Sequence, residues 1–145
     1  MSRIRVSASI PASPRRVWAD LRDIASHVEW MEDAVAIRFD SSRTSGVGTI
    51  FNCDTKVGPV RLTDRMEVTE WVPGEVMGIR HVGLVTGDGR FRLKRRWRGG
   101  TTFIWEERLF FPWYMGGPVG ALVGSVVLRR IWRRNLANLR TRFTD

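Results

Sequence analysis

Four polar side chains stand on predicted strand faces that are otherwise apolar, and with these residues the sequence could do chemistry. They are Asp64, His81, Arg95 and Glu107. A buried charge costs several kcal/mol unless it is paired. One interpretation is a structural ion pair of Arg95 with Glu107 or Asp64. The other is a polar anchor for a ligand oxygen, with His81 or Glu107 available for proton transfer. Binding or structure is favoured over catalysis.

The motifs of other reaction classes are absent from the sequence. There is no glycine-rich phosphate loop ending in Lys-Ser or Lys-Thr, and no nucleophile elbow. The two histidines, His27 and His81, lack a local acidic partner, and Cys53 is the only cysteine. Neither a metal site nor a cofactor is therefore predicted. We interpret Gly87-Asp88-Gly89 as a turn between strands.

Length and composition predict one domain that covers residues 1–145. The chain of 145 residues is 43% apolar and 27% charged, which excludes a disordered chain and a multi-span membrane protein. A net charge of +9 indicates an anionic partner or a coding bias towards arginine. The first residues lack the apolar stretch of a signal peptide, so a cytoplasmic location is expected. Residues 109–128 carry no charge, but their prolines and glycines argue against a membrane span.

Apolar periodicity predicts an α+β fold. Residues 3–10 alternate as a strand, Ser13-Pro14 is typical of a helix start, and a second short helix is expected over 24–29. Period-two patterns then predict about six further strands, and a long helix is expected from 116–118 to about 141. An antiparallel sheet curled around that terminal helix is the natural packing.

Two predicted hairpins assign the faces of the sheet. A two-residue turn at Gly58-Pro59 sets Val57 opposite Val60, and a three-residue loop over 98–100 joins a second pair of strands. The first hairpin then directs to one face Phe51, Cys53, Thr55, Leu62, Asp64, Met66 and Val68. The second directs to one face Phe91, Leu93, Arg95, Trp97, Phe103, Trp105, Glu107 and Leu109.

A basic ridge lies on the opposite face of the second strand pair. It consists of Arg90, Arg92, Lys94, Arg96 and Arg98. Such a ridge can neutralise phosphates, but this one has no interleaved aromatic side chains for base stacking. We interpret it as a solvated face and do not expect a nucleic-acid partner.

Several segments carry a family resemblance. They are residues 12–18 with the sequence ASPRRVW, Asp23, His27, Trp30, Gly46-Val47-Gly48, and Val68-Thr69-Glu70-Trp71 with Pro73. The chain resembles the START-related helix-grip superfamily, in its polyketide cyclase/dehydrase and lipid-transport (SRPBCC) branch. The resemblance implies a curved antiparallel sheet wrapped around a long C-terminal helix, two short helices after the first strand, and an enclosed apolar cavity. Members of the family bind lipids, hormones or polyketides, or cyclise or dehydrate polyketides, and share no catalytic motif.

The predicted function is the binding of a hydrophobic, lipid- or polyketide-like small molecule in a closed cavity between sheet and terminal helix. The expected ligand-binding residues are Phe51, Met66, Met77, Ile79, Phe91, Phe103, Trp105, Leu128 and Trp132. Two alternatives stay open. One is a polyketide cyclase or dehydratase that uses the four polar residues, and the other is a non-enzymatic adaptor whose basic surface meets RNA or a membrane.

The outer side of the terminal helix combines apolar and basic residues. Four apolar residues, Leu122, Val123, Val126 and Val127, precede Arg129, Arg130, Arg133 and Arg134. A homodimer through this face is the favoured interpretation, and docking on an anionic membrane surface is the second. The third is that residues 111–117 fold over the apolar patch and cover it.

Overall fold

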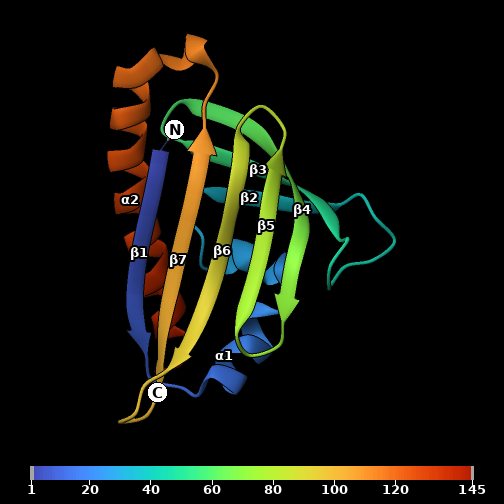
Figure 1. Ribbon diagram of the computed structural model, residues 1–145, viewed down its shortest axis with the longest axis vertical. Coiled ribbons are helices and arrows are strands. Elements are labelled where there is room, and N and C mark those ends of the chain that lie inside the picture. Colours follow the sequence, from blue (N-terminus) through green and yellow to red (C-terminus); the bar gives the residue numbers. More distant parts are fainter. Residues whose placement is uncertain (1, 145) are drawn as a thin grey trace.

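A curved antiparallel sheet and one long helix make up most of the computed structural model, which describes residues 2–144 (Figure 1). The elements in chain order are β1 (Ser2–Ile10), α1 (Pro14–Leu21), η1 (Ile24–Glu29), β2 (Ala34–Phe39), β3 (Ile50–Val57), β4 (Val60–Val72), β5 (Val76–Val82), β6 (Thr86–Arg95), β7 (Thr101–Phe110), η2 (Trp113–Met115) and α2 (Gly117–Thr141). The seven strands are ordered β1-β7-β6-β5-β4-β3-β2. This arrangement confirms the predicted α+β helix-grip fold. The extent of the domain, 1–145, stays a prediction, and its two end positions lie outside the described residues.

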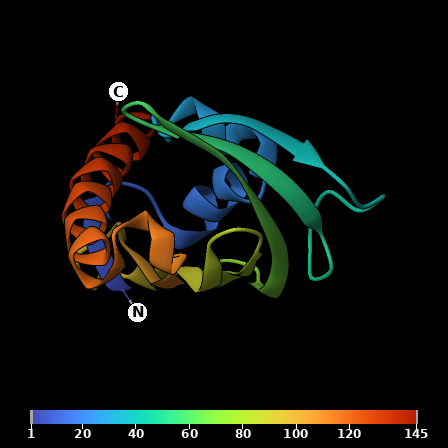
Figure 2. The same cartoon turned by 90° about the horizontal axis from the view of Figure 1, so that it is seen from above.

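The segment after β1 forms helices where local sequence signals place them. The Oγ of Ser13 accepts a hydrogen bond from the backbone N–H of Arg16 at 3.2 Å, and Pro14 occupies the first helical position of α1. Both features are typical of helix starts. Buried Val17, Trp18 and Leu21 then fix α1 against the sheet. Viewed from above, α1 and η1 lie within the curve of the sheet, and α2 lies along one side of it (Figure 2).

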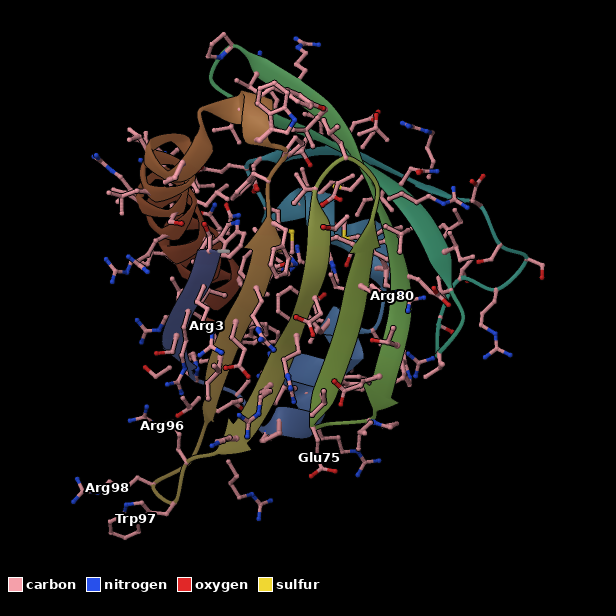
Figure 3. All side chains as sticks on the ribbon, turned by 45° about the horizontal axis from the view of Figure 1, so that its top comes forward. Arg3, Glu75, Arg80, Arg96, Trp97 and Arg98 are labelled. Carbon is pink, nitrogen blue, oxygen red and sulfur yellow. The ribbon has the colours of Figure 1, made fainter. Side chains whose placement is uncertain are left out.

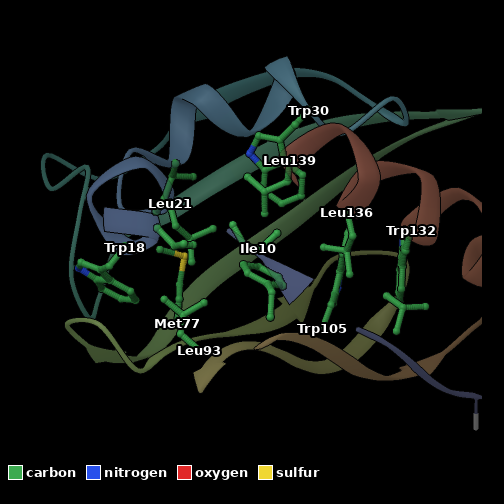
Figure 4. Close-up of a cluster of buried hydrophobic side chains, with 14 of the residues drawn as sticks. Ile10, Trp18, Leu21, Trp30, Met77, Leu93, Trp105, Trp132, Leu136 and Leu139 are labelled. Carbon is green, nitrogen blue, oxygen red and sulfur yellow. The ribbon is translucent and has the colours of Figure 1, made fainter. Parts of the chain in front are cut away.

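The C-terminal half of α2 is anchored in the core. Its buried residues are Trp132, Asn135, Leu136 and Leu139. The three apolar ones pack among buried side chains from the sheet and α1 (Figure 4). Asn135 is fully buried, yet both ends of its amide are satisfied. Its Oδ1 accepts from the backbone N–H of Glu32 at 2.9 Å, and its Nδ2 donates to Asp33 Oδ1 at 2.7 Å. These bonds fix the loop before β2 against α2.

The predicted register is confirmed in one hairpin and shifted in the other. The β3–β4 hairpin has Val57 opposite Val60, as predicted from the Gly58-Pro59 turn. In the β6–β7 hairpin, Arg95 is opposite Thr101, so the loop is longer than predicted and the register is shifted by two residues. The backbone N–H of Arg96 bonds to the carbonyl of Gly100 at 3.1 Å within this loop.

A shift of two residues keeps every side chain on its predicted face, because side chains alternate with period two. It nevertheless moves the loop residues off the sheet. Trp97 is 88% exposed at the projecting end of the hairpin, beside Arg98 (Figure 3). The prediction that Trp97 lies on the inner face with the core residues is therefore wrong.

Candidate functional site

A cavity of about 460 Å³ lies between the concave face of the sheet and α2. Its wall contains nearly all of the side chains that the hairpin phases and helix face predicted: Phe51, Met66, Met77, Ile79, Phe91, Trp105, Leu128 and Trp132. Phe103 is the exception. It is fully buried in the core, and its ring packs on Phe91 at 5.2 Å between centroids.

The cavity wall combines flexible methionine side chains with one stacked pair of tryptophans. The methionines at 31, 66, 77 and 115 all line the cavity. Unbranched thioether side chains adjust to differently shaped partners. Trp105 and Trp132, in contrast, stack in parallel with their ring centroids 4.5 Å apart. This aromatic pair joins β7 to α2 and forms a flat part of the wall.

The cavity is open on one side, so the prediction of a closed cavity is wrong. Val60 at the tip of the β3–β4 hairpin and Val123 on α2 both line it, and they are 48% and 56% exposed. The mouth therefore lies between this hairpin and the N-terminal half of α2. Gly120 and Gly124 stand on the cavity side of that half. Because glycine has no side chain, neither residue can reach across to close the gap.

A buried polar cluster occupies one part of the otherwise apolar wall. His81 on β5 lies between two carboxylates, and its Nδ1–H donates to Asp64 Oδ2 at 2.7 Å. Its Nε2–H donates to Glu107 Oε1. The other oxygen of Glu107, Oε2, accepts from the indole N–H of Trp105 at 2.8 Å. Asp64 Oδ1 is buried and has no hydrogen-bond partner among the described residues.

One glycine on β6, Gly89, leaves room for this cluster. His81 on β5 and Glu107 on β7 are separated by β6, where Gly87 pairs with His81 and Gly89 pairs with Glu107. A Cβ added at Gly89 would lie 2.4 Å from Glu107 Cγ, so any larger residue would displace the carboxylate. The interpretation of Gly87-Asp88-Gly89 as a turn is therefore wrong. Gly89 leaves room for the Glu107 side chain that His81 contacts, whereas Gly87 has a positive φ of 129° and a Cβ there would meet the backbone carbonyl of Arg108.

The environment of His81 fixes its charge. Burial opposes the charged form, but the carboxylates of Glu107 and Asp64 outweigh burial and raise the pKa of His81 to about 10. At neutral pH the group is therefore an imidazolium between two carboxylates. Both of its N–H groups are bound to protein oxygens, so His81 itself has no free proton directed into the cavity.

Arg95 is not part of this cluster. It is exposed at the end of β6, opposite Thr101, whereas Glu107 pairs with Gly89 six residues earlier on the same strand. The predicted ion pair of Arg95 with Glu107 or Asp64 is therefore wrong. His81 is the cation of this cluster, and Arg95 lies at the end of β6.

Three further titratable residues line the cavity and were not among the predicted ligand-binding residues. Asp33 lines the cavity beside Asn135, and burial raises its pKa despite the hydrogen bond from Asn135. His27 also lines it, but burial lowers its pKa, and its Nε2 lies 2.7 Å from the carbonyl of Leu21. Burial raises the pKa of the Cys53 thiol to about 12, which makes it a poor nucleophile. No local sequence signal distinguishes Asp33, because its place depends on Asn135 of α2.

The sequence matches one family model across almost its whole length. Residues 1–144 match the model described as polyketide cyclase/dehydrase and lipid transport. The chain belongs to this family. Membership confirms the resemblance derived from the sequence, and it fits a helix-grip fold around an apolar cavity. A search of curated protein sequences gives no match.

Solved structures similar to this family member include three that bear on its fold. A START superfamily protein from Mycobacterium smegmatis is 9% identical with a TM-score of 0.79, over 97% of this chain and 96% of that chain. The Zhui aromatase/cyclase from Streptomyces sp. R1128 is 14% identical with a TM-score of 0.75, over 97% and 92%. The di-domain ARO/CYC BexL is 13% identical with a TM-score of 0.79, over 99% of this chain and 50% of that chain. At these identities the likeness shows the fold.

Two further features bear on the class of site. Within residues 2–144, no helix is both long and apolar enough to cross a membrane. In the same residues, no group of three or more His, Cys, Asp or Glu side chains is arranged to hold a metal ion. The candidate site is an apolar cavity whose wall carries the His81 cluster and Asp33.

Proposed function

We propose that this family member binds a hydrophobic small molecule, lipid-like or polyketide-like, in the cavity between the sheet and α2. The observation that carries the proposal is a cavity of about 460 Å³ whose wall is apolar apart from a few polar side chains. Small-molecule sites typically have about 300–1,000 Å³, mostly apolar walls and a few placed polar groups. Family membership and the fold shared with an aromatase/cyclase support the same proposal.

Two tryptophans provide a matched test of this proposal. Trp105 lies in the cavity wall, and Trp97 is exposed at the β6–β7 hairpin. We expect Trp105→Ala to weaken binding of the neutral dye N-phenyl-1-naphthylamine by about fivefold or more, since aromatic contacts contribute about 1 kcal/mol beyond burial. Trp97→Ala should bind as wild type does. Equal affinity of both variants, with folding checked by circular dichroism, would contradict the placement of the ligand.

A second pair of variants tests the same point by filling the cavity. Leu128 lines the cavity, whereas Leu122 on the same helix is 67% exposed. Leu128→Trp should reduce dye binding because the larger ring takes up cavity volume, and Leu122→Trp should not. Native mass spectrometry of the protein purified from its own host then identifies any ligand that co-purifies.

Catalysis is the second candidate function, as cyclisation or dehydration of a bound polyketide-like substrate. The observation in its favour is the set of carboxylates on the cavity wall, of which Asp33 has a pKa raised by burial. A carboxyl group with a raised pKa is a better general acid near neutral pH. If Asp33 transfers a proton, Asp33→Asn abolishes conversion of a β-polyketone while leaving dye affinity within about twofold of wild type. Loss of dye binding in parallel with conversion would instead assign Asp33 to binding.

The apolar face of α2 supports a partner surface in addition. Val119, Leu122, Val123 and Val126 are all more than half exposed, so the segment 111–117 does not cover them. We keep the homodimer as the proposed occupant and an anionic membrane as the alternative outcome. Light scattering of wild type and Val126→Asp, with and without anionic vesicles, separates the two.

A cytoplasmic location likewise stays a prediction.

A further inference from the structure

We infer that the cavity discriminates among ligands by charge: it accepts uncharged molecules whose polar end donates a hydrogen bond, such as a hydroxyl or phenol, and rejects carboxylates. This inference rests on the function proposed above and specifies the class of ligand. It follows from the polar groups on the cavity wall and from the contacts they already make.

The charged groups on the cavity wall are mostly acidic. Asp33, Asp64 and Glu107 all line the cavity, and His81 is the cation set between the last two. One imidazolium against two adjacent carboxylates leaves the cluster with a net negative charge, to which Asp33 adds when it is ionised. Arg90 also contributes to the lining, but its guanidinium reaches Glu70 at 4.0 Å and Glu106 at 3.6 Å. A carboxylate entering the cavity would therefore meet no free cation in this cluster.

The hydrogen-bond donors of the polar cluster are already engaged with protein oxygens. Both N–H groups of His81 are bound to carboxylates, and the indole N–H of Trp105 is bound to Glu107. The ring nitrogen Nε2 of His27 is engaged with the carbonyl of Leu21. Carboxylate oxygens, in contrast, have lone pairs to spare, because each can accept two bonds. The cluster is short of donors even for its own atoms, as the unpartnered Asp64 Oδ1 shows.

A ligand group that does not match the polar cluster lowers the binding affinity. A group buried without a hydrogen bond, or beside a like charge, loses the water that solvated it and receives nothing in exchange. A hydroxyl that donates to a wall carboxylate avoids this loss. A site built to hydrogen-bond one functional group discriminates strongly against an analogue that lacks it. The apolar body of the ligand then contributes affinity and the polar cluster contributes selectivity.

Three ligands of nearly equal size test the inference by isothermal titration calorimetry. They are 2-naphthol, which donates a hydrogen bond, 2-methylnaphthalene, which has no polar group, and 2-naphthoate, which is an anion. The expected order of affinity is naphthol, then methylnaphthalene, then naphthoate, with naphthoate about tenfold or more weaker than naphthol. Naphthoate binding as tightly as methylnaphthalene would overturn the inference and leave the proposed function intact. Failure of all three to bind would overturn the proposed function itself.

Neighbouring glutamates on β7 give a matched pair of variants. Glu107 faces the cavity, and Glu106 lies on the other face of the sheet beside Arg90 and Arg92. Glu107→Gln removes one cavity charge and should raise naphthoate affinity relative to naphthol, whereas Glu106→Gln should change neither. An unchanged ratio in Glu107→Gln would show that this cluster does not set the selectivity. If Glu107→Gln fails to fold, Asp33→Asn removes a carboxylate from the same wall and should change the ratio in the same direction.

Discussion

The two halves of α2 come from one continuous helix but meet different surroundings. In the C-terminal half, Trp132, Asn135, Leu136 and Leu139 are buried against the sheet and the loop before β2. In the N-terminal half, Val119, Leu122, Val123 and Val126 are exposed, and glycines stand on the side that faces the cavity. One half of the helix closes the core, and the other half borders the mouth of the cavity.

This difference shows how one helix can combine stability with access. Full burial of large side chains at one end supplies the packing that holds α2 on the sheet. The other end can then leave space unfilled, since it is not needed to hold the helix in place. An open apolar cavity costs stability, and the packed half offsets that cost.

The largest expected effect is the difference in unfolding free energy between alanine substitutions in the two halves of α2. Leu139 is fully buried in the packed half, and Leu122 is exposed in the open half. We expect Leu139→Ala to lower the free energy of unfolding by about 2–5 kcal/mol, because it leaves a cavity in a dense core. Leu122→Ala should change it by less than about 0.5 kcal/mol. Urea denaturation followed by circular dichroism measures both, and similar losses in the two variants would contradict the division of the helix.

An intermediate effect on stability is expected from the polar cluster of Asp64, His81 and Glu107 on the sheet. The pKa of His81 is raised to about 10 from its usual 6.5, so the folded state holds this proton more tightly than the unfolded state. Its contribution is fully present below pH 6.5 and is lost as the pH rises towards 10. Between pH 6.5 and 8.5 the stability difference between wild type and His81→Gln should shrink by about 2 kcal/mol. Unfolding curves at both pH values check this result, and a difference that stays the same at both pH values would show that folding does not raise the pKa of His81.

The smallest effect is expected at the rim of the sheet. Arg95 is exposed and far along β6 from the position opposite Glu107. The effects of Arg95→Met and Glu107→Gln on stability should therefore add to within about 0.5 kcal/mol. His81→Gln and Glu107→Gln, whose side chains are hydrogen-bonded, should depart from additivity by more. A double-mutant cycle in which Arg95 and Glu107 couple instead would restore the ion pair predicted from the sequence.

Local signals in the sequence predicted much of the fold. The proline turn at 58–59 predicted the register of β3 and β4, and the serine-proline pair predicted the start of α1, because both depend on backbone preferences of neighbouring residues. Alternation predicted the inner face of β6 and β7 even though the register is shifted, since a shift of two residues preserves the faces.

The candidate site was less accessible to prediction because it depends on contacts across three strands. The bridge from His81 to Glu107 requires a glycine at position 89 of β6, and Gly87-Asp88-Gly89 resembles a turn when it is considered alone. Asp33 reaches the cavity wall because Asn135, distant in sequence, fixes its loop. Charge partners of this kind follow from the tertiary arrangement and not from local spacing.

Methyl NMR of methionine tests most directly whether the ligand lies between the sheet and α2. Met31 lines the cavity from the loop before β2, and Met66, Met77 and Met115 line it from β4, β5 and η2. With 13C-methyl methionine, titration with N-phenyl-1-naphthylamine should shift the Met66 and Met77 methyl signals strongly, since both methionines lie on the sheet side of the cavity. Leu128→Trp should suppress these shifts, and Leu122→Trp should leave them unchanged. Saturable dye binding that leaves the Met66 and Met77 signals in place would contradict the account.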